Sequence, residues 1–92
     1  MWKVQVPTPS AKRLEKDRTM VVEEYGAFHS MKHRFPIPEG DTEFVFDFAF
    51  EEDDPHINEY ILDASVTYNC YVEYKNSTGS RVEQIPVELE QI

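Results

Sequence analysis

The clearest pattern in the chain is a strict alternation of apolar and polar side chains from residue 59 to residue 74. The even positions, from Tyr60 to Tyr74, are apolar or aromatic, and the odd positions are mostly polar. Successive side chains of a β-strand point to opposite faces, so a period of two predicts a strand with one face on a core and the other in water. We therefore predict one long strand over residues 59–74.

A second alternation covers residues 43–50. Phenylalanine occupies every even position from Phe44 to Phe50, and Asp47 stands among the opposing odd positions. The row of rings predicts a strand that buries its even side chains. A turn signal, Pro38-Glu-Gly-Asp41, precedes it, so we predict a hairpin that pairs residues 30–37 with residues 43–50.

Shorter patterns predict three further strands. Residues 2–6 alternate until Pro7 ends the run, and residues 19–25 are rich in β-branched side chains until Gly26. The last strand is predicted over residues 81–91.

Two features describe that last strand. Its apolar positions change parity between Val82 and Ile85, which predicts a β-bulge near Gln84. Proline has no amide hydrogen for a ladder, so Pro86 predicts that this strand lies at a sheet edge.

Together these patterns predict a mainly β fold. We expect an antiparallel sheet of five or six strands built from hairpins, with at most one short helix near residues 10–18. A chain of 92 residues has room for one core, so residues 1–92 are predicted to form a single domain. Residues 1–18 either pack on the sheet or form a loosely packed basic segment.

Charge is distributed unevenly along the chain. The formal net charge is −9, with +3 on residues 1–34 and −12 on residues 35–92. The forty residues from Phe35 to Tyr74 hold eleven acids and no lysine or arginine. This balance argues against nucleic acid as a direct partner and favours an electrostatic partner of opposite charge.

The acids and the strand pattern coincide. Nine acids of this stretch occupy odd positions, and the pleat that buries the aromatic rows should turn those carboxylates outward. Tyr71 is predicted to point outward with them, as an amphipathic anchor. The predicted partner-binding residues, completed by two even-numbered acids of the central run, are Glu39, Asp41, Glu43, Asp47, Glu51, Glu52, Asp53, Asp54, Glu59, Asp63, Tyr71 and Glu73.

These observations predict a non-enzymatic protein–protein interaction domain whose acidic sheet face binds a basic protein surface. One version is a DNA mimic that inhibits a nucleic-acid-binding protein, with carboxylates in place of phosphates. The plain alternative is a solvated face whose acids prevent edge aggregation. A structural alternative is a homodimer, a larger homo-oligomer or a subunit of a viral or phage assembly, in which the basic part of one copy contacts the acidic part of the next.

Candidate chemistry is sparse. His29 and His33 share a face in either secondary structure, as in half of a zinc site, but the candidates for the further ligands, His56, Glu24 and Asp54, do not stand at a telling spacing. Cys70 lies on the apolar side of the long strand, where cysteine acts as a small hydrophobe. Without a catalytic or phosphate-binding motif, we expect no enzyme activity, no cofactor and no metal.

No run of apolar residues exceeds three, so neither a membrane span nor a secretory leader is expected. We expect a cytoplasmic protein, in the host cytoplasm if the chain is viral.

Overall fold

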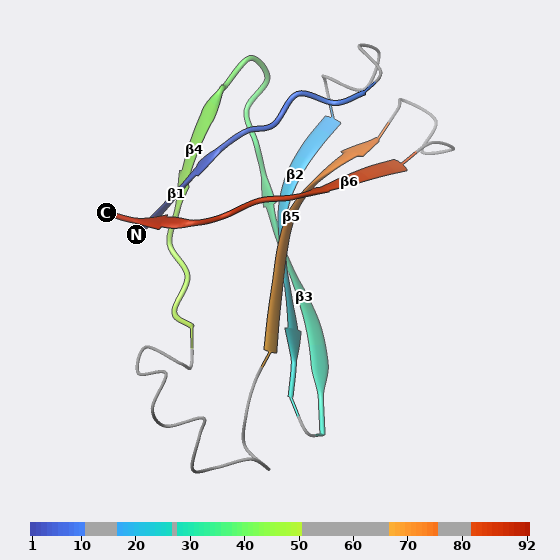
Figure 1. Cartoon of the computed structure of the whole chain (residues 1–92). Coiled ribbons are helices and arrows are strands. Elements are labelled where there is room, and N and C mark those ends of the chain that lie inside the picture. Colours follow the sequence, from blue (N-terminus) through green and yellow to red (C-terminus); the bar gives the residue numbers. More distant parts are fainter. Residues whose placement is uncertain (11–16, 27, 51–66, 76–81) are drawn as a thin grey trace.

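The protein is described here by a computed structural model that covers residues 1–10, 17–26, 28–50, 67–75 and 82–92. These residues form seven β-strands in two antiparallel sheets and contain no helix. The smaller sheet has the order β4-β1-β7, made of β4 (Glu43–Phe46), β1 (Trp2–Gln5) and β7 (Glu90–Gln91) (Figure 1). The larger sheet has the order β3-β2-β5-β6, made of β3 (Ser30–Pro36), β2 (Asp17–Tyr25), β5 (Thr67–Lys75) and β6 (Val82–Pro86).

The mainly β, antiparallel prediction is confirmed, with seven strands in two sheets in place of five or six in one. The predicted strand at 59–74 is found as β5 over its second half, and residues 59–66 lie outside the described residues. The helix predicted near 10–18 falls mostly outside them as well. Its last two residues, Asp17 and Arg18, belong to β2.

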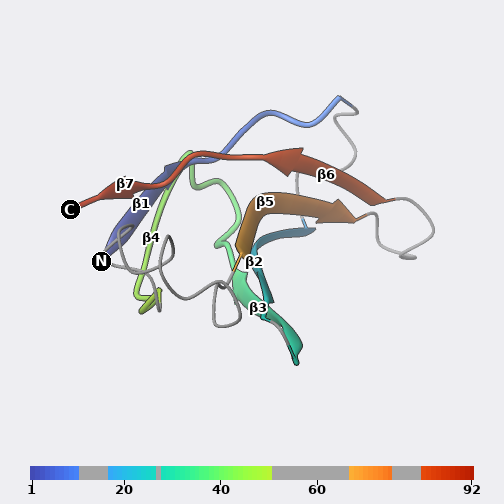
Figure 2. The ribbon, with the colours of Figure 1, turned by 60° about the horizontal axis from the view of Figure 1, so that its bottom comes forward.

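The C-terminal segment serves both sheets. β6 pairs with β5, β7 pairs with β1, and between them the Val87 amide donates a hydrogen bond to the Cys70 carbonyl, 3.1 Å away (Figure 2). The predicted single strand over 81–91 is therefore two shorter strands, because the chain leaves β5 after Pro86 and crosses to β1. This crossing joins the two sheets.

The predicted bulge near Gln84 is absent. The register runs without interruption from Lys75 opposite Val82 to Tyr71 opposite Pro86. The change of apolar parity has a simpler cause, since Val82 lies on the outward side and is 48% exposed. The edge position that Pro86 predicted is confirmed, because β6 ends the larger sheet.

The predicted hairpin between residues 30–37 and 43–50 is wrong. β3 pairs with β2, from Thr19 opposite Pro36 to Tyr25 opposite Ser30, and β4 pairs with β1. Pro36 and Pro38 cannot donate to a ladder, so the chain turns after β3 and crosses to the other sheet. Gly40, with a φ of 89°, lies in the connecting turn, a conformation that suits glycine.

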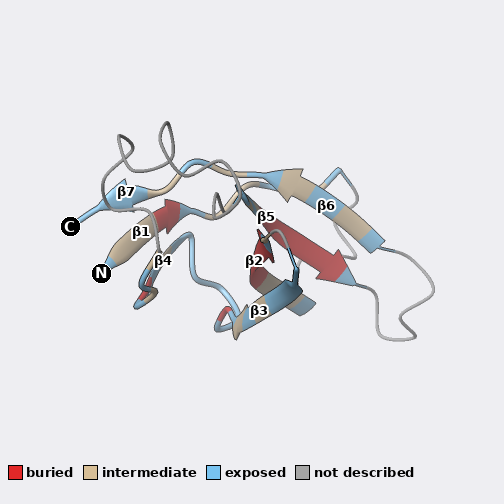
Figure 3. Cartoon of the chain, turned by 90° about the horizontal axis from the view of Figure 1, so that it is seen from below, coloured by how far each residue is buried: buried red, intermediate tan, exposed pale blue. Residues whose placement is uncertain are grey.

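The core lies between the inward faces of the two sheets. Met20, Val22 and Val72 come from the larger sheet, and Val4 and Phe46 come from the smaller one. Figure 3 shows the buried stretches on β2 and β5. The inward phenylalanine row is confirmed, because all four of its rings pack in or against this core although the strand itself ends at Phe46. Each ring contributes roughly 1.5–3 kcal/mol when it is fully buried.

Candidate functional site

Four of the predicted acids gather on the turn after β3 and along β4. Glu39 and Asp41 flank Gly40 in the turn, and Glu43 and Asp47 lie on the outward side of β4 and its continuation. All four are exposed. Glu43 and Asp47 face outward because the phenylalanines at the even positions face the core, and Glu39 and Asp41 lie in a surface turn. We call Glu39, Asp41, Glu43 and Asp47 the acidic face.

The turn that carries the acidic face is held from β2. The Arg18 guanidinium donates hydrogen bonds to the carbonyls of Pro38 and Asp41, each at 2.5 Å. The Ile37 amide donates to the Arg18 carbonyl at 3.0 Å. Arg18 therefore fixes the backbone of the turn and leaves the carboxylates of the turn pointing into water.

The carboxylates of the acidic face have no ion pair with any lysine or arginine that the structure describes. Within the described part of the chain, Gln5 Nε2 donates a hydrogen bond to Glu43 Oε2 at 3.0 Å. The described lysines, and Arg34, pair with acids elsewhere: Lys3 with Glu90, Lys32 with Glu23, and Arg34 and Lys75 with Glu73. None of these cations forms an ion pair with the acidic face, although Lys3 stands on β1 directly opposite Val45 and the Arg18 guanidinium is bound to the backbone of the turn.

An apolar side chain stands in the middle of the acidic face. Val45 lies on the same outward side, between Glu43 and Asp47, and is 43% exposed. Alternate residues of a strand are roughly 7 Å apart, so Val45 lies within reach of any surface that contacts both carboxylates. The alternation over residues 43–50 already places Val45 among the outward acids, so the sequence contains this signal.

Glu73 lies on the predicted side of β5 but not in the predicted environment. Its side chain is buried, with the whole residue only 4% exposed, and it meets Arg34 Nη1 at 2.8 Å and Gln84 Nε2 at 3.3 Å. Burial alone would raise the pKa of the Glu73 carboxyl, but these hydrogen bonds and the charges of Arg34 and Lys75 hold the pKa below its ordinary value. Glu73 is a paired internal charge, so the prediction that it belongs to a solvated acidic surface is wrong.

Tyr71 is also covered. It faces outward from the sheet as predicted, but it is only 3% exposed, and Gln84 Nε2 lies 3.5 Å from its hydroxyl. Burial and the neighbouring Glu23 carboxylate raise the pKa of the Tyr71 phenol to about 12. The predicted role of Tyr71 as an exposed anchor is therefore wrong.

Arg34 explains why this side of the larger sheet is closed. It stands on β3 directly opposite Val21 of β2, and its guanidinium reaches Glu73 on β5, one strand further on. The side chain thus spans β2, and Val21 beneath it is fully buried. Long charged side chains cover apolar surface in this way while their heads stay hydrated.

Glu23 completes this polar layer. It accepts a hydrogen bond from Asn69 Nδ2 at 3.0 Å and lies 3.4 Å from Lys32 Nζ. Burial raises the pKa of the Glu23 carboxyl, but hydrogen bonds from Asn69, Tyr25 and Lys32 lower it by more than burial raises it. The pKa of Glu23 therefore lies below its ordinary value. We call Glu23, Arg34, Asn69, Tyr71, Glu73 and Gln84 the polar network.

The remaining predicted site residues lie outside the described residues. These are Glu51, Glu52, Asp53, Asp54, Glu59 and Asp63.

The two histidines share one carboxylate. Glu24 is buried, with Oε2 2.8 Å from His29 Nε2 and Oε1 3.5 Å from His33 Nε2. Among the described residues no group of three or more His, Cys, Asp or Glu is arranged to hold a metal ion. Glu24 was one of the candidate partners of these rings in the sequence, with His56 and Asp54, and the register of β2 against β3 brings it to them.

Cys70 lies beside the core, as its position in the pattern predicted. It is half-buried and free, and burial raises the pKa of its thiol. A raised pKa favours the neutral thiol, whereas the thiolate is the nucleophilic form of cysteine.

No protein family model, no curated protein and no solved structure matches this chain. In the part of the chain that the structure describes, no helix is long and apolar enough to cross a membrane.

Proposed function

We propose that the protein is a non-enzymatic interaction domain whose acidic face binds a basic surface of another protein. The observation that carries this proposal is the exposure of Glu39, Asp41, Glu43 and Asp47 without an ion pair to any described lysine or arginine. The same chain pairs its buried acids, Glu23 and Glu73, with cations. Charge that is kept unpaired on one face attracts a cationic partner over about a Debye length.

Charge and apolar contact have separate roles at such a face. The carboxylates steer the encounter and suppress like-charged partners, and they contribute little affinity each while they remain hydrated. Val45 is the apolar contact that a partner would desolvate between Glu43 and Asp47. Apolar centres with polar rims are the usual anatomy of a binding surface.

A nucleic-acid-binding protein is one source of a basic surface, because such proteins neutralise phosphates with lysine and arginine. Duplex DNA carries one charge per roughly 1.7 Å of axis, whereas alternate strand residues are roughly 7 Å apart. The acidic face by itself is therefore sparser than DNA. The DNA-mimic version predicts in addition that duplex DNA and this protein compete for the same partner.

The test uses a short oligolysine peptide as the basic probe and a matched pair of variants. Glu43→Gln with Asp47→Asn removes two charges from the acidic face, and Asp17→Asn with Glu83→Gln removes two charges of the larger sheet that lie outside the acidic face. Fluorescence anisotropy then gives the Kd of each variant as salt is raised from about 50 to about 500 mM, where screening falls to a few ångströms.

We expect the acidic-face variant to bind the peptide roughly 2- to 30-fold more weakly than the wild type at low salt, from two exposed charge pairs of about 0.2–1 kcal/mol each. The control variant should retain most of the wild-type affinity, and high salt should abolish the difference. Equal weakening in both variants would mean that net charge alone attracts the peptide, and the proposed face would be rejected.

A further inference from the structure

The hairpin of β2 and β3 ends in an exposed apolar tip. Phe28 is 98% exposed, and Tyr25 and Met31 beside it are about half exposed. Nothing in the described part of the chain covers the Phe28 ring. We call Tyr25, Phe28 and Met31 the hairpin tip. Aromatic residues and methionine are enriched at protein interfaces. Burial of an exposed ring by a partner is favourable, because it removes apolar surface from water.

The loop that presents Phe28 is fixed on both sides. The Gly26 amide donates to the His29 carbonyl at 2.8 Å, and His29 Nε2 lies 2.8 Å from the buried carboxylate of Glu24. The His29 ring also lies against Gly26, where an added Cβ would be 2.4 Å from the ring. These contacts hold Gly26 and His29, the described residues on either side of Phe28, which lowers the ordering cost of a contact made there.

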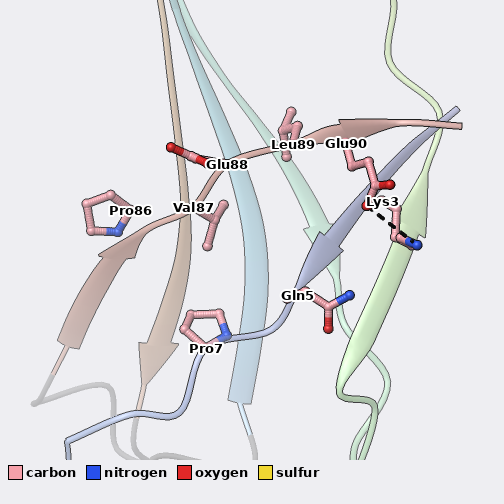
Figure 4. Close-up of a pocket in the computed structure, with 8 residues that line it drawn as sticks. All are labelled: Lys3, Gln5, Pro7, Pro86, Val87, Glu88, Leu89 and Glu90. Atoms are coloured by element: carbon pink, nitrogen blue, oxygen red, sulfur yellow. Dashed lines mark ion pairs between the residues drawn. The ribbon is translucent and has the colours of Figure 1, made fainter.

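A groove lies at the opposite part of the molecule, where β1 and the C-terminal segment separate. The two pair only at Trp2 and Lys3, because the C-terminal segment then turns away toward β5. The hollow between them has a volume of about 450 Å³ (Figure 4). It is lined by apolar Pro7, Pro86, Val87 and Leu89 and by polar or charged Lys3, Gln5, Glu88 and Glu90.

The hairpin tip and the groove match in chemistry. Phe28 is an apolar knob, and a hollow of this volume accommodates a side chain of its size. On β3 beside the tip, Lys32 and Arg34 pair with Glu23 and Glu73 but keep side chains that are 49% and 44% exposed. In the groove, Glu90 pairs with Lys3. Glu88 has no ion pair with a described residue, so it remains available to a cation beside the incoming ring.

We propose that the groove of one copy receives the hairpin tip of a second copy of this chain. The hairpin projects away from the end of the molecule where the two termini meet, so a tip does not reach its own groove (Figure 1). Each copy then offers one tip and one groove, and the contact is heterologous. Such a contact produces chains or closed rings rather than a symmetric dimer.

Two other occupants fit less well. A net charge of −9 opposes approach to an anionic membrane. Edge-to-edge pairing of β3 with another β3 is opposed by Lys32, Arg34 and Pro36, the residue types that protect sheet edges.

The test measures mass by sedimentation equilibrium at low salt across a wide concentration range. We expect the average mass of the wild type to rise beyond that of a dimer, or to reach that of a small ring. Phe28→Ser should weaken association roughly ten- to hundredfold, as expected from the loss of one buried ring. The control, Val82→Ser, removes an exposed apolar side chain outside both surfaces and should leave association unchanged.

A mixing experiment separates this contact from general stickiness. The Phe28→Ser variant keeps a groove, and a variant with Pro86→Trp and Glu88→Arg keeps a tip while its groove is filled and its charge reversed. At concentrations where the wild type associates, each variant alone should remain a monomer. The mixture should form a heterodimer with one copy of each variant and no larger species. Circular dichroism checks the fold of both.

Three results would overturn the inference: a wild-type monomer at every concentration, loss of association with Val82→Ser as with Phe28→Ser, or a mixture that forms no heterodimer. Vesicle binding that depends on Phe28 in a strictly monomeric protein would identify a lipid surface as the occupant instead.

Discussion

Glu73 is the residue at which charge and stability are most closely linked. Its carboxylate is almost removed from water, and Arg34 and Gln84 supply the hydrogen bonds that keep it ionised. A buried charge without partners is strongly unfavourable, so Glu73 requires Arg34 in place. Arg34 is in turn unavailable to the acidic face.

The pKa of Glu73 gives a pH prediction. Its folded pKa lies below the ordinary value of 4.5, so its contribution to stability is present above that value and is lost as pH falls through the folded pKa. We expect the free energy of unfolding, measured in urea, to decrease between about pH 5 and pH 3. Glu73→Gln should flatten this decrease.

Arg34→Met supplies the complementary variant, because it raises the folded pKa of Glu73 and should move the loss of stability to higher pH. The control is Glu88→Gln, an exposed acid without a described ion pair, which should leave the wild-type profile intact. A Glu73→Gln profile that coincides with the wild type would show that Glu73 does not contribute to the acid transition.

At the scale of the elements, the β2–β3 hairpin depends on the contact between Gly26 and His29. A Cβ at residue 26 would lie 2.4 Å from the His29 ring, so Gly26→Ala must displace that ring from Glu24. The His29 side chain is 46% exposed and its ring can move aside, so we expect a loss of only about 0.2–1 kcal/mol in the free energy of unfolding, the size of one partly exposed ion pair. Chemical denaturation provides the measurement.

A double-mutant cycle identifies the cause of that loss. In a His29→Ala background the steric conflict is gone, so Gly26→Ala should have almost no additional effect. An equal loss in both backgrounds would place the cause in the backbone and contradict the account of the hairpin.

The sequence predicted faces better than partners. β-branched content identified β2, alternation identified the second half of the long strand and the inward phenylalanine row, and Pro86 identified an edge. It did not reveal that β3 pairs with β2, because a period of two states which side a residue faces and not which strand lies beside it.

The errors in the candidate site follow from that one missed pairing. Parity placed Tyr71 and Glu73 on the outward side correctly, but their exposure depends on Arg34, which reaches them only when β3 lies next to β2. Glu39, Asp41, Glu43 and Asp47 were predicted correctly as exposed, because their exposure depends only on local alternation and the turn at Gly40. A local pattern predicts which side of a strand a residue faces. It does not predict that a long side chain such as Arg34 crosses from a neighbouring strand and covers that side.

At the scale of the whole molecule, ion-paired acids and unpaired acids lie on different surfaces. Lys32, Arg34 and Lys75 lie with buried acids on the outward side of the larger sheet, while the acidic face lies on the turn and strand that lead into the smaller sheet. The proposed function depends on this separation of paired charge from unpaired charge.

The most direct test of this separation is an amide chemical-shift map of the isotope-labelled protein during titration with the oligolysine peptide at low salt. The account predicts shifts concentrated on residues 38–47, including Val45, with the amides of Glu23 and Glu73 unchanged. Shifts spread evenly over all exposed acids, or strongest at the polar network, would contradict it.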